Sequence, residues 1–473
     1  MKYLYGAAVQ GIQNFIFQTN KLSEITGASE LVSKICTEYF SEVVTGDPQI
    51  VVQAAGNVKC IFHDRQSCEE IVRIFPKKIL EKVPGVTISQ AVVELSSADA
   101  TTDDFMELES RLRTQRNKAD RPTTIGLMSI ERSRQTGLPL IAGTREDEAT
   151  SSKKSILKET AHNLCKIAFG DDMTSSRITY DTDEMIGENN WIAVIHADGN
   201  GLGQVVQKIA KQGTAALAEF SRKLDDANKK SAQAAFREIN EKYDLGSTKI
   251  PIRPIVLSGD DFTMICRGDF ALDYAKSFIK HFEEETSKNG DKLTACAGIA
   301  YVKSSFPFYY GYEMAESLCS AAKADAKSLA EEQSKAPSCI MFYKIEDSFT
   351  DSYNEIKERV LTTRTKDKLS FAFGPYYINK MNDRWTVDEL QKLVEELSYD
   401  DKDCNAVKSH IRQWLSIRFN DAGQAELKLN RIIKTLESKK DIIDKLTTPQ
   451  GDKVLAYDVL SQHSVKYLRT ANK

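Results

Sequence analysis

The chain has 473 residues, of which 41% are hydrophobic and 28% are charged, with 24 Gly and 11 Pro. This composition is typical of a folded globular protein and excludes a collagenous, low-complexity or disordered chain. The 64 basic and 68 acidic residues leave a formal net charge of −4, which argues against a protein that coats nucleic acid over its whole surface. No apolar run approaches the roughly 18 residues of a membrane span. The nine Cys form no CxxC pair, so we expect a cytoplasmic protein of about three domains that does not contact membranes.

The first hundred residues alternate between short apolar strands and amphipathic helices. We predict strands at 3–10, 50–55, 58–63 and 86–95, and helices at 14–44 and 67–83. The order β-α-β-β-α-β is that of a ferredoxin-like domain, which we assign to residues 1–105.

The same order returns near residue 190. We predict strands at 191–197, 252–258, 262–268, 293–302 and 339–345, and helices at 202–243, 270–288 and 312–332. The chain is therefore expected to be an α+β protein with an internal duplication. Its second ferredoxin-like domain occupies residues 190–348.

The remaining segments differ in character from the two copies. Residues 106–189 form a helical and loop-rich connector, with a helix predicted at 153–168. The connector begins with five basic residues: Arg111, Arg113, Arg116, Lys118 and Arg121. Residues 349–473 show helical spacing alone and form a helical C-terminal domain, in which Thr386 and Glu389 make a capping box.

Three aspartates lie at the predicted ends of neighbouring strands in the second domain. Asp198 follows the first strand, and Asp260 and Asp261 occupy the turn of the central hairpin. The first strand and the hairpin are neighbours in a ferredoxin-like sheet. Their carboxylates should therefore meet and repel one another unless cations neutralise them. Carboxylate oxygens suit Mg²⁺ or Mn²⁺, which also bind substrate phosphates, so we predict a catalytic metal site.

Glycines and lysines near these aspartates predict contacts with nucleotide phosphates. Gly199, Gly201 and Gly259 have no Cβ atom, so a triphosphate can approach the backbone. Lys323 and Lys327 lie four residues apart on one face of a predicted helix and could contact phosphate oxygens. The alternatives are ordinary turn chemistry for the glycine segments and a solvated helix face for the lysines.

The first domain lacks the acidic residues of the second. Gln10 and the pair Asn57-Val58 stand at the positions equivalent to the three aspartates. We therefore expect chemistry in the second domain and a structural or regulatory role for the first. His63-Asp64 is interpreted as a turn rather than an HD phosphohydrolase centre, because no other His precedes it.

These segments resemble the large polymerase and cyclase subunit of type III CRISPR effector complexes, a family with two ferredoxin-like palm domains. GIQNFIF (11–17) and KLSEITGASELV (21–32) are similar to the opening signature of the first palm. HADGNGLG and SGDDF resemble the active palm, whose hairpin usually has the sequence Gly-Gly-Asp-Asp, and AAKADAK (321–327) is similar to the family's Lys helix. Ser258 replaces the first Gly of that hairpin, and the family's zinc-finger cysteines are absent. We expect a short or stand-alone relative without the HD nuclease.

The resemblance implies a metal-dependent nucleotidyltransferase that joins NTPs, with ATP favoured, into cyclic or short oligonucleotide messengers for anti-phage or CRISPR-type signalling. Asp198, Asp260 and Asp261 would bind Mg²⁺ or Mn²⁺. The nucleotide-binding residues would be Gly199, Asn200, Gly201, Ser258, Gly259, Lys323, Lys327, Gly11, Gln13 and Ser29. A protein or RNA activator, a homodimer or a larger complex are the implied partners. The alternatives are a non-catalytic scaffold that binds nucleotide or RNA, and a diguanylate or class III nucleotide cyclase.

Overall fold

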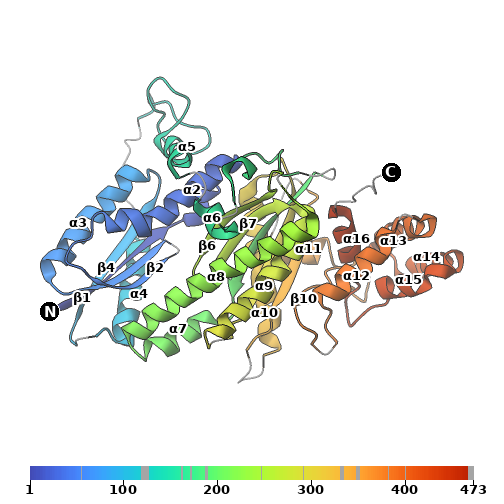
Figure 1. The fold of residues 1–473 in the computed structure, drawn as a ribbon. Coiled ribbons are helices and arrows are strands. Elements are labelled where there is room, and N and C mark those ends of the chain that lie inside the picture. Colours follow the sequence, from blue (N-terminus) through green and yellow to red (C-terminus); the bar gives the residue numbers. More distant parts are fainter. Residues whose placement is uncertain are drawn as a thin grey trace.

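The computed structural model describes residues 1–466 except for 55, 98, 119–126, 161–162, 171–172, 187–189, 247, 291, 331–334, 348–351, 382 and 400. Arg121 and the domain boundaries predicted at 189 and 348 lie outside the described residues. A first sheet at the N-terminal end, a larger second sheet and a group of C-terminal helices follow one another along the molecule (Figure 1).

The first sheet has the strand order β2-β3-β1-β4, and all its neighbouring strands are antiparallel. The strands are β1 (Lys2–Gln10), β2 (Gln49–Ala54), β3 (Asn57–Phe62) and β4 (Thr87–Leu95). Alternate residues of β1 pack on opposite faces, as the period of two in a strand requires. Helices α2 (Leu22–Lys34) and α3 (Arg65–Lys82) cover one face, and α4 (Thr102–Arg116) covers the other.

The second sheet has the order β10-β9-β8-β5-β7-β6, with β5 in its interior. Its strands are β5 (Trp191–Gly199), β6 (Ile252–Ser258), β7 (Asp261–Arg267), β8 (Ala295–Lys303), β9 (Cys339–Lys344) and β10 (Tyr376–Tyr377). The strands β8-β5-β7-β6 repeat the order of the first sheet. The predicted α+β fold with two ferredoxin-like units and a helical C-terminal region is therefore confirmed.

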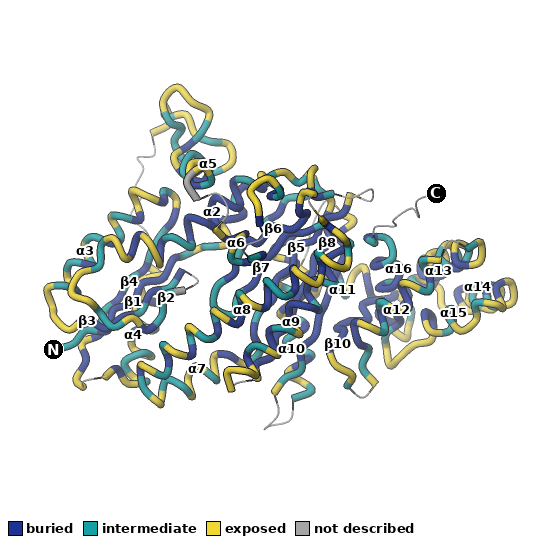
Figure 2. The backbone as a smooth tube through the Cα atoms, in the orientation of Figure 1, coloured by how far each residue is buried: buried dark blue, intermediate teal, exposed yellow. Residues whose placement is uncertain are grey.

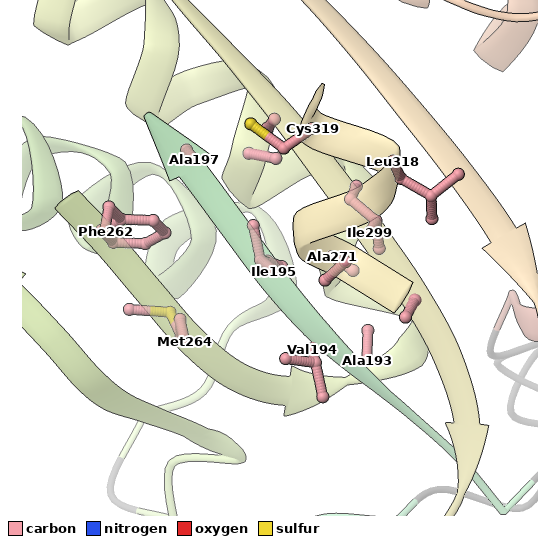
Figure 3. Packing of buried hydrophobic residues seen from close by; sticks show 14 of the residues in the cluster. Ala193, Val194, Ile195, Ala197, Phe262, Met264, Ala271, Ile299, Leu318 and Cys319 are labelled. Carbon is pink, nitrogen blue, oxygen red and sulfur yellow. The ribbon is translucent and has the colours of Figure 1, made fainter. Parts of the chain in front are cut away.

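Helices lie on both faces of the second sheet. α8 (Thr214–Tyr243) and α9 (Ala271–Lys288) cover the face of Phe262, whose ring stacks on Phe278 of α9 at 4.0 Å. α10 (Phe308–Ser328) covers the opposite face, where Val194 of β5 contacts Gly311. Figure 3 shows side chains of β5 and β7 in this buried core, with Ala271 and Leu318 from the flanking helices.

Two predicted helices are each divided in the structure. The helix expected at 202–243 consists of α7 (Leu202–Ala210) and α8, because Gly213 between them has a φ of 113°. Such a backbone conformation favours glycine and cannot continue an α-helix. The helix expected at 14–44 consists of α1 (Ile12–Ile16), α2 and the π-helical turn Ile35–Tyr39. Between α1 and α2, Thr19 accepts the Lys21 N–H and donates to Glu24.

Helix α8 joins the two sheets. It spans 30 residues and runs from the edge strand β2 of the first sheet across the second sheet (Figure 1). Near its first turn, Gln49 Nε2 donates to Thr214 Oγ1 at 3.2 Å. Leu217 packs into the core between the first sheet and α4. One continuous helix therefore belongs to the cores of both units.

The connector and the C-terminal region are helical. The connector contains α5 (Glu148–Thr160) and α6 (Asn163–Phe169) in the region where a helix was predicted at 153–168, and residues 161–162 lie outside the described residues. The C-terminal helices are α11 (Tyr353–Arg359), α12 (Val387–Ser398), α13 (Lys402–Asn420), α14 (Ala422–Thr435), α15 (Lys440–Thr447) and α16 (Ala456–Val465). The capping box of Thr386 and Glu389 is present. Exposed residues lie along the outer faces of α13–α15 (Figure 2). Across the described residues, no helix has both the length and the apolar character needed to cross a membrane.

The C-terminal region contains one buried carboxyl group, on Asp458 of α16, that gives a test of the fold. Its Oδ2 accepts hydrogen bonds from Tyr376 (2.7 Å) and from the Gly374 N–H (3.1 Å). Burial raises its pKa from 3.8 to about 7. A folded-state pKa above the unfolded value means that stability is greatest below the unfolded pKa and is lost as the pH rises.

We therefore predict that Asp458→Asn weakens the pH dependence of stability, because an amide keeps the acceptor oxygen and does not ionise. Between about pH 4 and pH 7 the wild type should lose on the order of 3 kcal/mol relative to the variant, since one pKa unit corresponds to about 1.4 kcal/mol. Urea unfolding at several pH values measures this difference. If the free energy of unfolding depended on pH equally in the two proteins, Asp458 would not have the raised pKa assigned to it.

The end of β5 generates a second test, because position 199 has no room for a side chain. A Cβ atom on Gly199 would lie 2.1 Å from Leu202 Cδ1, whereas one on Gly203 would meet nothing within 4 Å. We expect Gly199→Ala to lower the free energy of unfolding by about 1–3 kcal/mol through overpacking. Gly203→Ala, in the first turn of α7, should raise it by up to about 0.5–1 kcal/mol. Equal effects of the two changes in urea titrations would be the contrary outcome.

Candidate active site at the end of β5

The three aspartates come together where β5 and β7 meet. Asp198 lies near the end of β5, and Asp261 begins β7, which pairs directly with β5. Asp260 lies beside Gly259 in the two-residue turn between β6 and β7. Asp198 lies close enough to Asp260 to raise the pKa of the Asp260 carboxyl group. The convergence expected from the ferredoxin-like topology is therefore observed.

The crowding of these groups changes their acidity. Burial, followed by the negative charges of Asp198, Asp260 and Glu316, raises the pKa of Asp261 to about 8. Burial and then Asp198 also raise the pKa of Asp260. The Asp261 side chain is 33% exposed as a whole, yet its Oδ1 atom is buried and has no hydrogen-bond partner. An unpaired buried carboxylate oxygen is costly unless a proton or a cation satisfies it.

Lys323 of α10 partly neutralises the cluster. Its ammonium group forms a direct ion pair with Asp198 Oδ2, and both side chains are partly exposed. Glu316 lies two turns earlier in α10, and its pKa is raised by burial, by Glu313 and by Asp198. The spacing of seven between Glu316 and Lys323 places both on one helix face, a signal that the sequence interpretation missed. Lys327, one turn beyond Lys323, is exposed.

The side chains are not arranged as a closed metal cage. Within the described part of the chain, no three His, Cys, Asp or Glu side chains are placed to hold a metal ion as they stand. Lys323 occupies one oxygen of Asp198. The neighbouring carboxyl groups of Asp198 and Asp260 and the unpaired Oδ1 of Asp261 are nevertheless the chemistry that a hard divalent cation satisfies. The metal-binding role of the three aspartates remains a prediction.

A buried histidine lies behind Asp261. His196 Nδ1 is 3.5 Å from Asp261 Oδ1 and 3.1 Å from Thr263 Oγ1. Burial lowers the pKa of His196 to about 4, so the ring is neutral at pH 7. Tyr312 of α10 packs edge-on against this ring at 5.5 Å. His196 precedes Asp198 by two residues on the same face of β5, and the period of a strand could have identified it.

The predicted glycine and asparagine residues shape the backbone around the cluster. Gly201 has a φ of 66° and Gly259 a φ of 63°, so both stand where glycine is favoured. Asn200 donates from Nδ2 to Thr294 Oγ1 at 3.1 Å and from its N–H to Thr294 O at 2.8 Å. Ser258 is outside the left-handed region, which explains how serine is accommodated where the resembled family has glycine.

A cavity of about 320 Å³ lies between the two units and reaches Asp261. Gln13 and Ser29 from the first unit and Ser258 from the second help to line it. Ser29 Oγ also donates to the Ile255 carbonyl of β6, so this side chain holds the units together.

The remaining predicted residues have local roles in the structure. Gly11 has a φ of 60° at the start of α1. Asp64 accepts the Ser67 N–H at 2.8 Å and caps α3, in line with the turn predicted there. At the start of α10, Phe308 is buried and Tyr310 is 46% exposed.

Comparison with known proteins agrees with this arrangement. Residues 191–330 match the family described as Cas10/Cmr2, second palm domain. No curated protein matches the chain. Among solved structures, a chain of the Csm1–Csm4 cassette in complex with one ATP aligns with a TM-score of 0.59 at 13% identity, covering 98% of this chain and 70% of that chain. The Csm1–Csm4 cassette with pppApApA gives 0.57 at 14% identity, with 98% and 69% covered.

A third structure comes from a larger assembly. The Csm1–Csm4 subcomplex of the type III-A CRISPR-Csm interference complex aligns with a TM-score of 0.56 at 14% identity, covering 98% of this chain and 70% of that chain. Identities this low establish a shared fold. The family match places the acidic cluster inside a recognised domain, since Asp198, Asp260 and Asp261 all fall within residues 191–330. Residues 191–330 are therefore assigned to the Cas10/Cmr2 second palm domain, within a chain that shares its overall fold with a chain of the Csm1–Csm4 structures.

Proposed function

We propose that this protein is a metal-dependent nucleotidyltransferase that joins NTPs, with ATP favoured, into cyclic or short linear oligonucleotides. The observation that carries the proposal is the convergence of Asp198, Asp260 and Asp261, with Lys323 beside them, next to the cavity between the two palms. The matched Csm1–Csm4 cassettes are in complex with one ATP, with pppApA or with cA4, which supports adenine nucleotides as the first substrates to test.

The proposed reaction is an in-line displacement at phosphorus. The 3′-hydroxyl oxygen of one nucleotide forms a bond to the α-phosphorus of the next, the bond to the pyrophosphate oxygen breaks, and the hydroxyl proton is released. Mg²⁺ or Mn²⁺ held by the three aspartates would supply Lewis-acid stabilisation of the attacking and leaving oxygens. Lys323 would contact phosphate oxygens as a point charge. Gly259 and Gly201 leave the nearby backbone free of Cβ atoms.

The interpalm cavity suits a nucleobase. Its volume of about 320 Å³ falls at the lower end of the range of about 300–1,000 Å³ for small-molecule sites. Ile16, Val32 and Leu164 supply apolar walls, and Gln13 and Ser29 supply polar groups. Asp261 also lines the cavity. A base in the cavity would therefore place its phosphates near the carboxylates.

The two unequal palms distinguish this proposal from a homodimeric cyclase. Palm-type cyclases pair two copies, whereas here the first unit, which lacks the acidic residues, already packs against the second through Ser29 and α8. The setting that we propose is anti-phage or CRISPR-type signalling, with a protein or RNA activator and a place in a complex like that of the Csm1–Csm4 structures. The non-catalytic scaffold is the outcome to be excluded by assay.

The direct test is incubation of the protein with each α-labelled NTP and Mg²⁺ or Mn²⁺. We expect pyrophosphate release and oligonucleotide products with ATP, and a loss of at least about 100-fold in the Asp260→Ala, Asp261→Ala double variant, as for removal of key electrostatic groups in enzymes. Mass spectrometry of the product determines ring size. Nucleotide binding without turnover, in the presence of candidate RNA and protein activators, would favour the scaffold.

Lys323 provides a second test because it contacts the cluster from outside the metal-binding set. Lys323→Met should reduce kcat/KM for ATP by about 10- to 100-fold, through the loss of one charge-assisted phosphate contact. Lys288→Met, on α9, removes an exposed lysine that pairs only locally with Glu285 and should change kcat/KM by less than about twofold. Equal behaviour of the two variants would remove Lys323 from the proposed site.

A further inference from the structure

Two side chains of α8 hold the backbone of the turn that carries Asp260. Asp225 Oδ1 accepts the Gly259 N–H at 3.1 Å. Asn228 Nδ2 donates to the Gly259 carbonyl at 2.9 Å and to the Asp261 carbonyl at 3.2 Å. Residues 225 and 228 lie three apart and therefore share one face of the helix. Both backbone polar groups of Gly259 are thus bonded to α8.

Side-chain packing does not hold Gly259, the first residue of this turn. Gly259 has a φ of 63°, and a Cβ atom there would meet nothing within 4 Å. A two-residue hairpin with positive φ at its first central residue favours glycine, which is also the residue that leaves the chain most freedom. The bonds from Asp225 and Asn228 therefore restrain the Gly259 backbone, and with it the direction of the Asp260 side chain, in addition to the strand pairing that positions Asp261.

Asn228 is placed for these bonds at an energetic cost. Its side chain is fully buried, and its Oδ1 has no hydrogen-bond partner. A buried, unpaired amide oxygen is unfavourable, and an apolar side chain at this position would avoid it. The compensation visible in the structure is that both amide hydrogens bond to carbonyls flanking Asp260. An aspartate at this position would instead face two carbonyl oxygens with a carboxylate.

Asp225 connects the turn to the interpalm cavity. Its Oδ2 forms an ion pair with Lys229, one turn later on α8, and both residues line the cavity together with Ser258 and Asp261. The helix is anchored at its other end in the core of the first palm by Leu217. The turn is therefore held by a helix that is itself fixed in both palms.

We propose that Asp225 and Asn228 are positioning residues that fix the Gly259–Asp261 turn so that its carboxylates face Asp198. The catalytic consequence rests on the proposed nucleotidyltransferase function, but the effect on the turn does not. Neither residue needs to contact substrate. Removal of Asn228, which is not among the residues lining the interpalm cavity, should lower kcat while leaving the affinity for NTP nearly unchanged. Asp225 does line the cavity, so its variant is compared by kcat and by the mobility of the turn.

The experiment compares Asn228→Ala and Asp225→Ala with Asn240→Ala in the full chain. Asn240 is also on α8, but its Oδ1 accepts from Arg177, away from the turn. Hydrogen–deuterium exchange of a peptide spanning 257–263 reports the turn without any need for catalysis. We expect faster exchange and a kcat about 10- to 100-fold lower in both test variants, with KM within about threefold for Asn228→Ala. Asn240→Ala should match the wild type in both readouts.

The conservative variant Asp225→Asn adds a control to this experiment. Asp225→Asn keeps an oxygen that can accept the Gly259 N–H and should restore most of kcat. Exchange at 257–263 that is unchanged in Asp225→Ala and Asn228→Ala overturns the proposal, as does faster exchange with an unchanged kcat. If Asn228→Ala does not fold, the partly exposed Asp225 still provides the comparison. A wild type that forms no product, together with faster exchange in the variants, contradicts the proposed function and keeps the inference about the turn.

Discussion

Repulsion among carboxylates is the constraint on which the rest of the site depends. Asp198, Asp260 and Asp261 converge at the end of β5, and Glu316 lies near enough to raise the pKa of Asp261 further. Such a cluster tends to separate or to take up protons unless positive charge and fixed backbone geometry oppose it. Lys323 supplies one charge, His196 stays neutral behind the cluster, and α8 fixes the turn. Lys323, the neutral His196 and the bonds from α8 thus each limit the repulsion among the carboxylates or its effect on the backbone.

The two units of the internal duplication differ in charge: the second carries the acidic cluster, and the first packs beside it without equivalent acidic residues. The first unit has the same strand order as the second but carries Gln10 and Asn57-Val58 in place of acidic residues. Because the first unit has no cluster of carboxylates that repel one another, it can line the cavity with apolar side chains such as Ile16 and Val32. Ser29 bonds it to the β6 backbone. One unit thus concentrates charge, while the other closes the space beside it.

Much of this arrangement could be predicted from the sequence because it follows from strand order. The positions of Asp198, Asp260 and Asp261 at one sheet edge are confirmed, since β5 and β7 had to be neighbours in a β-α-β-β-α-β unit. The break at Gly213 was missed because helical spacing continues through it and only the φ of 113° reveals it. The bonds of Asn228 and Ser29 join residues far apart in the chain, and no local pattern indicates such partners.

Helix α8 also limits how the molecule can move. At about 1.5 Å per residue, its 30 residues extend roughly 45 Å, from the Thr214 contact with β2 to the second sheet. A hinge between the palms would have to bend this helix or break its anchor at Leu217. A ligand of the interpalm cavity would therefore have to enter without a rigid-body opening of the two units. The existing shape of the cavity, rather than a domain opening rate, would then limit the size of the molecule that it admits.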